Sequence, residues 1–211
     1  MKKLIPVQRS FRAVVFLPIL LCAFVKIDIK PITIGTSLPH GSDSLVNVMN
    51  DKMVTLNSQM KTNGLLVMFS CNTCPFVIAN EKRIHEIQKL AQSLNIGMVV
   101  INSNEGKRDA DDSRSAMKSY GDDEKYLVPY LLDVNSVLAD AFGATRTPEN
   151  FLFDKNSNLV YQGAIDDSPK DPKAVTQHYL ADAMNAVVAG KEITTKTTVS
   201  AGCTIKRKVV Q

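Results

Sequence analysis

Two short apolar runs mark the centre of the chain. Residues 65–69 and 98–101 are uninterrupted apolar segments, and turn-forming residues bound them. Between them, apolar side chains recur at the spacing of one helix face: Val77, Ile84, Ile87, Ala91 and Leu94. The pattern predicts a strand–helix–strand unit over 65–101, with its strands covered on both faces and a right-handed connection.

The flanking segments extend this unit into an alternating layout. Upstream, residues 28–34 are predicted as an extended lead-in and residues 53–56 as a short strand. Downstream, the pattern predicts a solvated acidic loop over 103–113, a helix over 111–119, a strand over 128–132, a helix over 136–142 ended by Gly143, a hairpin of 150–153 and 159–161, a helix over 174–189 and a polar, basic tail to Gln211. This order predicts an α/β thioredoxin-like fold, in which helices flank a central mixed sheet with an inserted strand and helix.

The first 25 residues differ from the remainder of the chain. Residues 1–12 are basic and contain no acid, and residues 13–25 carry no charge. This is the pattern of a secretory signal, and the apolar stretch is short for a spanning helix. No clear cleavage triplet follows it, so a signal peptide and an uncleaved N-terminal membrane anchor both remain open, with lipidation at Cys22 or a buried core helix as lesser alternatives. We expect a thioredoxin-like domain over 26–211, in a secreted or periplasmic protein.

Composition and charge narrow the partner classes. Of the 211 residues, 45% are hydrophobic and 22% charged, which is typical of a globular protein and argues against global disorder. The net charge of +4 falls short of the basic stripe that nucleic-acid binding requires, so no nucleic-acid partner is expected. The three histidines make no metal-ligand spacing with the cysteines, and we expect neither a metal site nor another cofactor.

Cys71 and Cys74 form a C-x-x-C motif where the first apolar run meets the helix. Unpaired amides and the positive end of the helix dipole favour a thiolate there, and Pro75 suits the first helical turn. Cys71 is therefore expected to attack and Cys74, one turn later, to resolve the mixed disulfide with a protein dithiol or disulfide partner. Two structural cysteines, or half of a metal site, are the alternative interpretations of a lone motif.

Residues before the predicted hairpin complete the candidate site. In a thioredoxin-like fold the Thr147–Pro148 bond is expected to be cis and to face the dithiol, which leaves the Thr147 backbone to bind substrate. Outside that fold context, an ordinary trans turn proline is the alternative. Arg146 is a candidate for favouring the thiolate, and a solvated surface arginine is the equal alternative.

Several sequence blocks resemble a known family. They cover residues 66–77, 100–104, 129–133, 147–154, 159–163, 165–168 and 202–206. These blocks resemble the peroxiredoxin-like branch of the thioredoxin superfamily, related to alkyl hydroperoxide reductase and thiol-specific antioxidant proteins. The resemblance implies a thioredoxin fold and thiol redox chemistry. Arg146 stands where members of this branch often have a cysteine. Cys203 matches the Gly-Cys block of the branch, as a third redox thiol, a structural half-cystine or a small buried hydrophobe.

The sequence therefore predicts an extracytoplasmic thiol–disulfide oxidoreductase of undetermined direction. A peroxiredoxin-like peroxidase is the first alternative, but the proline and hydroxyl that the resemblance implies before a peroxidatic cysteine are missing. If Cys71 were the peroxidatic cysteine, Gly64 would stand at the proline position and Met68 at the hydroxyl position. If Cys74 were, those positions would hold Val67 and Cys71. A non-enzymatic copper-binding or interaction module is the second alternative, because two thiolates suit copper(I), although no Met-rich or His-rich tract accompanies them.

Overall fold

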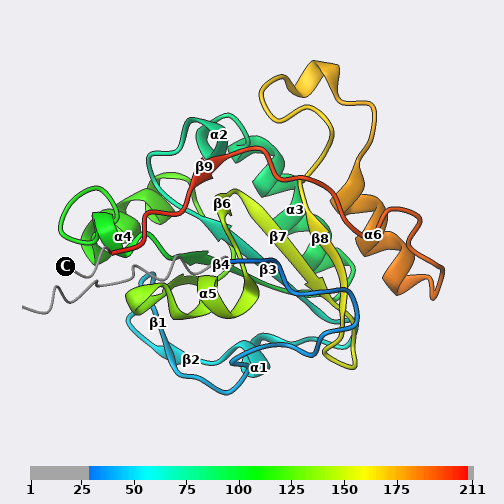
Figure 1. The fold of residues 1–211 in the computed structure, drawn as a ribbon, viewed down its shortest axis with the longest axis horizontal. Helices are drawn as coiled ribbons and strands as arrows, with labels where there is room; N and C mark the ends of the chain where they lie inside the picture. Colours follow the sequence, from blue (N-terminus) through cyan, green and yellow to red (C-terminus); the bar gives the residue numbers. More distant parts are fainter. Residues whose placement is uncertain (1–28, 209–211) are drawn as a thin grey trace, which may run out of the picture.

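A computed structural model describes residues 29–208, which form a seven-stranded mixed sheet with helices packed against it (Figure 1). The strand order is β2-β1-β5-β4-β3-β7-β8. Strand bounds are β1 Leu45–Asn47, β2 Met53–Val54, β3 Leu65–Ser70, β4 Gly97–Asn102, β5 Tyr130–Leu132, β7 Glu149–Phe153 and β8 Leu159–Gly163. Strands β3, β4 and β5 are parallel neighbours, whereas β7 pairs antiparallel with β3 and with β8. The predicted α/β thioredoxin-like fold is confirmed.

The helices divide between two cores, one on each face of the sheet. Their bounds are α1 Leu56–Gln59, α2 Pro75–Ile78, α3 Glu81–Ser93, α4 Arg114–Asp123, α5 Val137–Phe142 and α6 Tyr179–Val188. Side chains alternate along β3, so Leu66 and Met68 enter the core shared with α2, α3, α4 and α6, and Phe69 enters the core shared with α1 and α5. Every β3 residue is buried, as the uninterrupted apolar run predicted.

Several predicted boundaries are wrong for local reasons. The predicted helix after the C-x-x-C motif is split into α2 and α3 at Ala79–Asn80. Helix α4 begins three residues later than predicted, because the Ser113 hydroxyl accepts from the Ala116 amide and caps the helix start. Helix α6 begins at Tyr179, because Pro172–Ala174 form a separate 3₁₀ turn. The predicted strand over 53–56 is shortened to β2, since Thr55 caps α1.

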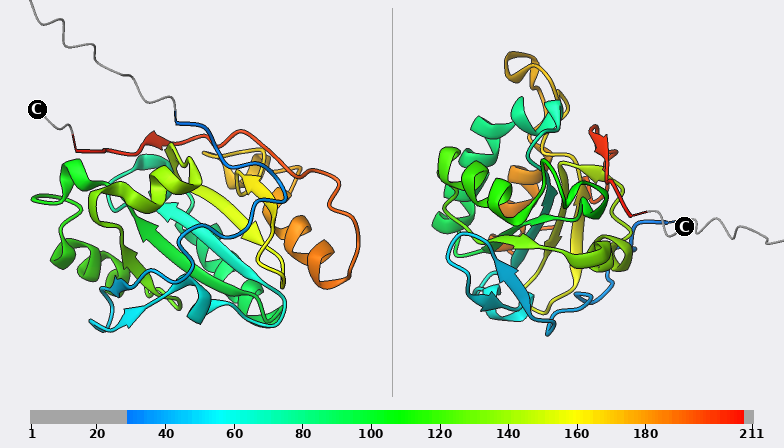
Figure 2. Two further views of the ribbon diagram at one scale, coloured as in Figure 1. Left: turned by 60° about the horizontal axis from the view of Figure 1, so that its bottom comes forward. Right: turned by 90° about the vertical axis from the view of Figure 1, so that its left-hand side faces the viewer.

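The C-terminal tail adds strand structure that the sequence pattern did not predict. After α6 the chain returns across the molecule, and β9 (Cys203–Thr204) pairs antiparallel with β6 (Arg146–Thr147) in a separate two-stranded sheet (Figures 1 and 2). Further upstream, Thr197 forms a bridge with Gln162 of β8. The tail, drawn in red, therefore lies against the body of the protein.

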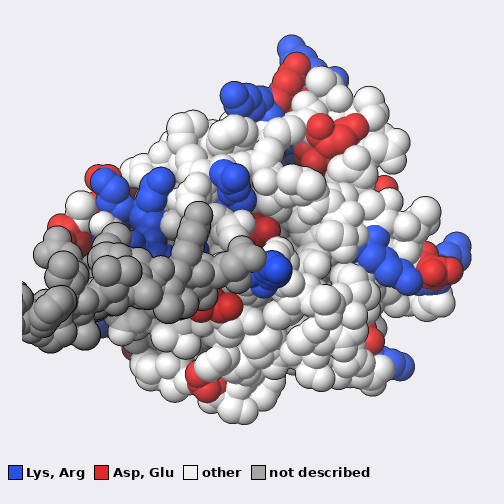
Figure 3. Space-filling model, viewed as in Figure 1, with Lys and Arg blue, Asp and Glu red and all other residues white. Residues whose placement is uncertain are grey.

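The charged surface on one face of the molecule is mixed in sign. Figure 3 shows lysine and arginine side chains interspersed with acidic ones and separated by uncharged surface. The predicted signal peptide or anchor at residues 1–25 lies outside the described residues. Between residues 29 and 208, no helix has both the length and the apolar character that crossing a membrane requires.

Candidate functional site

The C-x-x-C motif spans the gap between β3 and α2. Cys71 directly follows β3, and Cys74 directly precedes α2 with an extended backbone (φ −73°, ψ 121°). Each cysteine is 2% exposed. The helix begins only at Pro75, because Asn72 and Thr73 form a bend rather than a helical turn. The prediction that Cys71 stands at the helix start is therefore wrong by one turn, and the argument from helix-start amides applies to Cys74.

The loop before β7 contacts both sulfurs. The Thr147–Pro148 bond is cis, as predicted. The Thr147 hydroxyl oxygen lies 3.2 Å from Cys71 Sγ, and the Thr147 carbonyl oxygen lies 3.2 Å from Cys74 Sγ. Because a carbonyl only accepts, Cys74 donates this hydrogen bond when it is a thiol. The loop therefore faces the dithiol, while the substrate-binding role of Thr147 and Pro148 stays a prediction.

Cys203 lies beside the same loop. Its position in β9 is opposite Thr147, and its side chain packs against the core that contains Cys71 and Cys74. Its thiol and its backbone amide both favour the thiolate of Cys74 and so lower the pKa of that cysteine. All three cysteines are free thiols. In the described part of the chain, no group of three or more His, Cys, Asp or Glu residues is arranged to hold a metal ion. The structure thus brings Cys203 to the dithiol.

Arg146 is placed differently from the other predicted site residues. Its side chain is exposed, and its guanidinium donates to the Gly202 carbonyl at 3.2 Å. Glu149, which sequence reasoning missed, holds this loop: its buried carboxylate accepts from the amides of Thr145 (2.7 Å) and Arg146 (3.0 Å). Burial raises the pKa of Glu149, and those two amides oppose the rise. A thiolate-tuning role for Arg146 stays a prediction.

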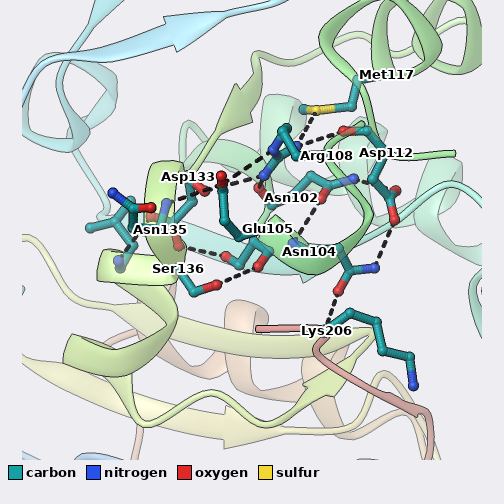
Figure 4. A network of polar contacts seen from close by, with 12 residues as sticks. Asn102, Asn104, Glu105, Arg108, Asp112, Met117, Asp133, Asn135, Ser136 and Lys206 are labelled. Carbon is teal, nitrogen blue, oxygen red and sulfur yellow. Dashed lines mark hydrogen bonds and ion pairs between the residues drawn. The ribbon is translucent and has the colours of Figure 1, made fainter. Parts of the chain in front are cut away.

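A buried polar network holds the C-x-x-C loop in place. The Asn72 amide donates to Asp112 Oδ1 at 3.0 Å, and Tyr130 donates to the Asn72 side-chain oxygen at 2.8 Å. Asp112 is fully buried and also accepts from Asn102 (2.6 Å) and Asn104 (2.8 Å), as Figure 4 shows. The prediction of a solvated loop over 103–113 is therefore wrong at Asn104 and Asp112. The polar residues that directly follow the buried strand β4 were the available sequence signal.

The two thiols differ in acidity. The pKa of Cys74 is lowered to about 4, because the Cys71 thiol, the Cys203 thiol and the amides of Val77 and Cys203 favour the thiolate more than burial opposes it. The pKa of Cys71 is raised by its hydrogen bond to Cys74 and by burial, and the charge of Asp112 adds to the rise. The Thr147 carbonyl, which accepts a hydrogen bond from the protonated Cys74 thiol, opposes this ionisation. Cys74 is therefore the more acidic thiol.

Comparison with known proteins gives one family and two related structures of similar length. The family profile described as Redoxin matches residues 33–178. An uncharacterized conserved protein from Geobacillus kaustophilus is 30% identical, with a TM-score of 0.79 over 85% of this chain and 94% of that one. A hypothetical protein from Sinorhizobium meliloti 1021 is 31% identical, with a TM-score of 0.77 over 86% and 98%. No curated protein matches the chain.

More distant solved structures share the fold alone. Peroxidoxin BcpB from Mycobacterium tuberculosis is 13% identical, with a TM-score of 0.55 over 74% of this chain and 96% of that one. A secreted disulfide oxidoreductase from the same organism, homologous to E. coli DsbE, is 14% identical, with a TM-score of 0.50 over 70% and 95%. With the Redoxin match spanning most of the sheet and the C-x-x-C site, the chain belongs to the Redoxin family of the thioredoxin superfamily and is a thiol redox protein.

Proposed function

We propose that this protein is a thiol–disulfide oxidoreductase that acts on protein dithiols or disulfides outside the cytoplasm. The observation that carries the proposal is the contact of Thr147 with both sulfurs of the C-x-x-C motif. A loop that touches both thiols is placed to hold a partner sulfur near them. The extracytoplasmic part rests on the charge pattern of residues 1–25.

The lowered pKa of Cys74, together with its place directly before α2, supports the attacking role for Cys74. Cys74, as a thiolate, attacks one sulfur of a partner disulfide, which forms a mixed disulfide and releases the other partner sulfur as a thiolate. Cys71 then attacks Cys74 Sγ, so that the Cys71–Cys74 disulfide forms and the mixed disulfide breaks. The proton that Cys71 loses goes to the departing partner sulfur. Run in reverse, the same steps oxidise a partner dithiol.

Trapping of mixed disulfides tests this assignment. In a Cys203→Ser background, Cys71→Ser should accumulate mixed disulfides with a disulfide-bonded protein substrate such as insulin, because the resolving thiol is gone. Cys74→Ser in the same background is the matched control and should trap none. Trapping by Cys74→Ser instead would return the attacking role to Cys71.

Two further measurements could contradict the oxidoreductase assignment. Absence of both trapping and insulin disulfide exchange would show that the protein is not an oxidoreductase of this kind. Peroxide reduction far faster than that of a free thiolate, and lost in Cys74→Ser, would favour a peroxidase.

Export is tested separately from chemistry. A reporter fused after Lys30 should appear outside the cytoplasm, released or membrane-attached, because residues 1–25 carry the signal pattern. Retention of the fusion in the cytoplasm would contradict this part of the proposal.

A further inference from the structure

The strand-pairing edge of the cis-proline loop is already occupied. An extended substrate can dock to such a backbone edge as an added strand. Here β9 takes that place beside β6 (Figure 1). Thr204 pairs with Arg146, and Cys203 pairs with Thr147. The residue that faces Thr147, and through it the dithiol, is therefore a cysteine of the same chain.

Two glycines leave room for this tail. A Cβ atom on Gly202 would lie 2.2 Å from the Thr147 carbonyl oxygen, a distance that no side chain tolerates. On β8, a Cβ on Gly163 would lie 2.2 Å from the Thr198 hydroxyl oxygen and 2.4 Å from the Thr198 carbonyl oxygen. The close approach of the tail to the loop thus depends on the absence of a side chain at Gly202, and its approach to β8 depends on the absence of one at Gly163.

Hydrogen bonds hold the tail on both sides of Cys203. Upstream, the Thr198 amide donates to the Gln162 carbonyl at 3.0 Å. Downstream, the Ile205 amide donates to the Thr145 carbonyl at 3.0 Å, and the Lys206 amide donates to Asn104 Oδ1 at 2.8 Å (Figure 4). Asn104 in turn donates to Asp112, the residue that holds the C-x-x-C loop. Cys203 therefore has a fixed position relative to the dithiol.

Exposure separates Cys203 from the other two thiols. Cys71 and Cys74 are each 2% exposed, whereas Cys203 is only partly buried. A partner sulfur that approaches the site from solvent therefore meets Cys203 first.

We propose that β9 is an internal substrate strand and that Cys203 is a third redox thiol. Cys203 exchanges with the Cys71–Cys74 disulfide to form a Cys74–Cys203 disulfide, which partners can reach from solvent. The proposal rests on the proposed function, which supplies that disulfide. Burial and the neighbouring Cys74 raise the pKa of Cys203 to about 11, so Cys203 gives up its proton as it attacks Cys74 Sγ. The Cys74–Cys203 bond forms and the Cys71–Cys74 bond breaks. Cys71 leaves with the electron pair and takes the proton that Cys203 gave up. One disulfide is exchanged for another, so no outside oxidant or reductant is consumed.

The test is to detect the Cys74–Cys203 bond directly. The full chain with Cys71→Ser is oxidised with oxidised glutathione, digested with trypsin without reduction and analysed by mass spectrometry. Cleavage after lysine places Cys74 in peptide 62–82 and Cys203 in peptide 197–206. The linked pair of peptides should be the main oxidation product.

The matched control moves the thiol by one residue. In Cys71→Ser with Cys203→Thr and Thr204→Cys, the composition of the tail is unchanged, but the thiol points to the opposite side of β9. We expect linkage to Cys74 to fall by about tenfold, because a disulfide tolerates only a narrow range of Cβ positions. Equal linkage in both variants, or none in the first, would overturn the proposal.

The outcome separates this inference from the proposed function. If the wild-type protein exchanges disulfides with insulin while Cys71→Ser gives no Cys74–Cys203 linkage, the internal substrate strand is wrong and the oxidoreductase assignment stands. If the linkage forms with the expected control but insulin exchange is absent, the partner assignment is wrong and the third redox thiol stands.

Discussion

The C-x-x-C loop and the C-terminal tail both bring sulfur to Thr147, but different forces hold them there. The loop follows a fully buried strand and is fixed by side-chain hydrogen bonds to the buried Asp112. The tail is held mainly by backbone hydrogen bonds and by close glycine contacts along its course. Damage to the support of the loop should therefore lower global stability, whereas damage to the tail should have a local effect.

The largest expected effect is the ionisation of Cys74, where donors from the loop and the tail meet. Its pKa of about 4 predicts a thiolate at pH 6, whereas an ordinary thiol is less than about 1% ionised there. Thiolate absorbance near 240 nm in the reduced protein should persist to pH 6 and disappear in Cys74→Ser. Cys203→Ala should raise the midpoint of the titration, because the side-chain donor from the tail is lost.

The same titration distinguishes the two cysteines. If the absorbance at pH 6 survives in Cys74→Ser and disappears in Cys71→Ser, Cys71 is the acidic thiol. The role assignment then reverts to the one predicted from the motif alone.

The second prediction concerns the support of the loop. In Asp112→Asn, an amide nitrogen replaces one carboxylate oxygen and faces a donor from Asn72, Asn102 or Asn104. We expect a loss of about 2–4 kcal/mol in the free energy of unfolding, because a buried network is left with unpaired donors. Urea denaturation measures it. The control is Asp111→Asn, whose side chain is exposed and whose carbonyl contact to Asn72 is unaffected; equal losses would contradict the network argument.

The sequence predicted what depends on local periodicity. The β3 and β4 runs, the apolar face of α3 and the hairpin of β7 and β8 all follow from residue spacing within short windows. The cis Thr147–Pro148 bond was predicted from the fold and is confirmed. These features make up the sheet centre and one side of the candidate site.

Features that depend on distant partners were missed. Strand β9 has only two residues, and its partner lies 56 positions earlier, so no local pattern marks it. Asp112 belongs to an acidic run that resembles a solvated loop, and only the fold places it under Asn72. The start of α2 was misplaced because the bend at Asn72–Thr73 leaves no periodic signal.

The third prediction tests whether the tail's support is local. Gly202→Ala should push β9 away from the cis-proline loop, because the new Cβ would overlap the Thr147 carbonyl. In the Cys71→Ser background, it should reduce Cys74–Cys203 linkage strongly, while the free energy of unfolding falls by only about 1–2 kcal/mol. Val199→Ala is the control, because Val199 lies on the same tail and is 92% exposed. A stability loss as large as that of Asp112→Asn would break the distinction between the two regions.

The smallest expected effect lies outside both regions, at Glu81 in α3. Its carboxylate is 8% exposed and accepts hydrogen bonds from Tyr120 and Tyr126. Burial raises the pKa of Glu81 to about 7, and the two tyrosines oppose that rise. Since the folded-state pKa lies above the unfolded one, ionisation opposes folding. The free energy of unfolding should therefore fall as the pH rises from about 4.5 to 7.

Glu81→Gln isolates this effect, because an amide oxygen still accepts from the tyrosines but carries no charge. We expect the wild-type protein to lose about 1–2 kcal/mol of stability between pH 5 and pH 8 relative to Glu81→Gln, measured by urea denaturation at both values. The exposed Glu86→Gln is the control and should follow the wild type. Parallel curves for wild type and Glu81→Gln would show that Glu81 ionises normally. A stability change below pH 7 would then have to come from the dithiol, where the ionisation of Cys74 changes the free energy of unfolding in the opposite direction. Because the pKa of Cys74 is lowered, its thiolate stabilises the folded protein at high pH, and this contribution is lost as the pH falls toward about 4.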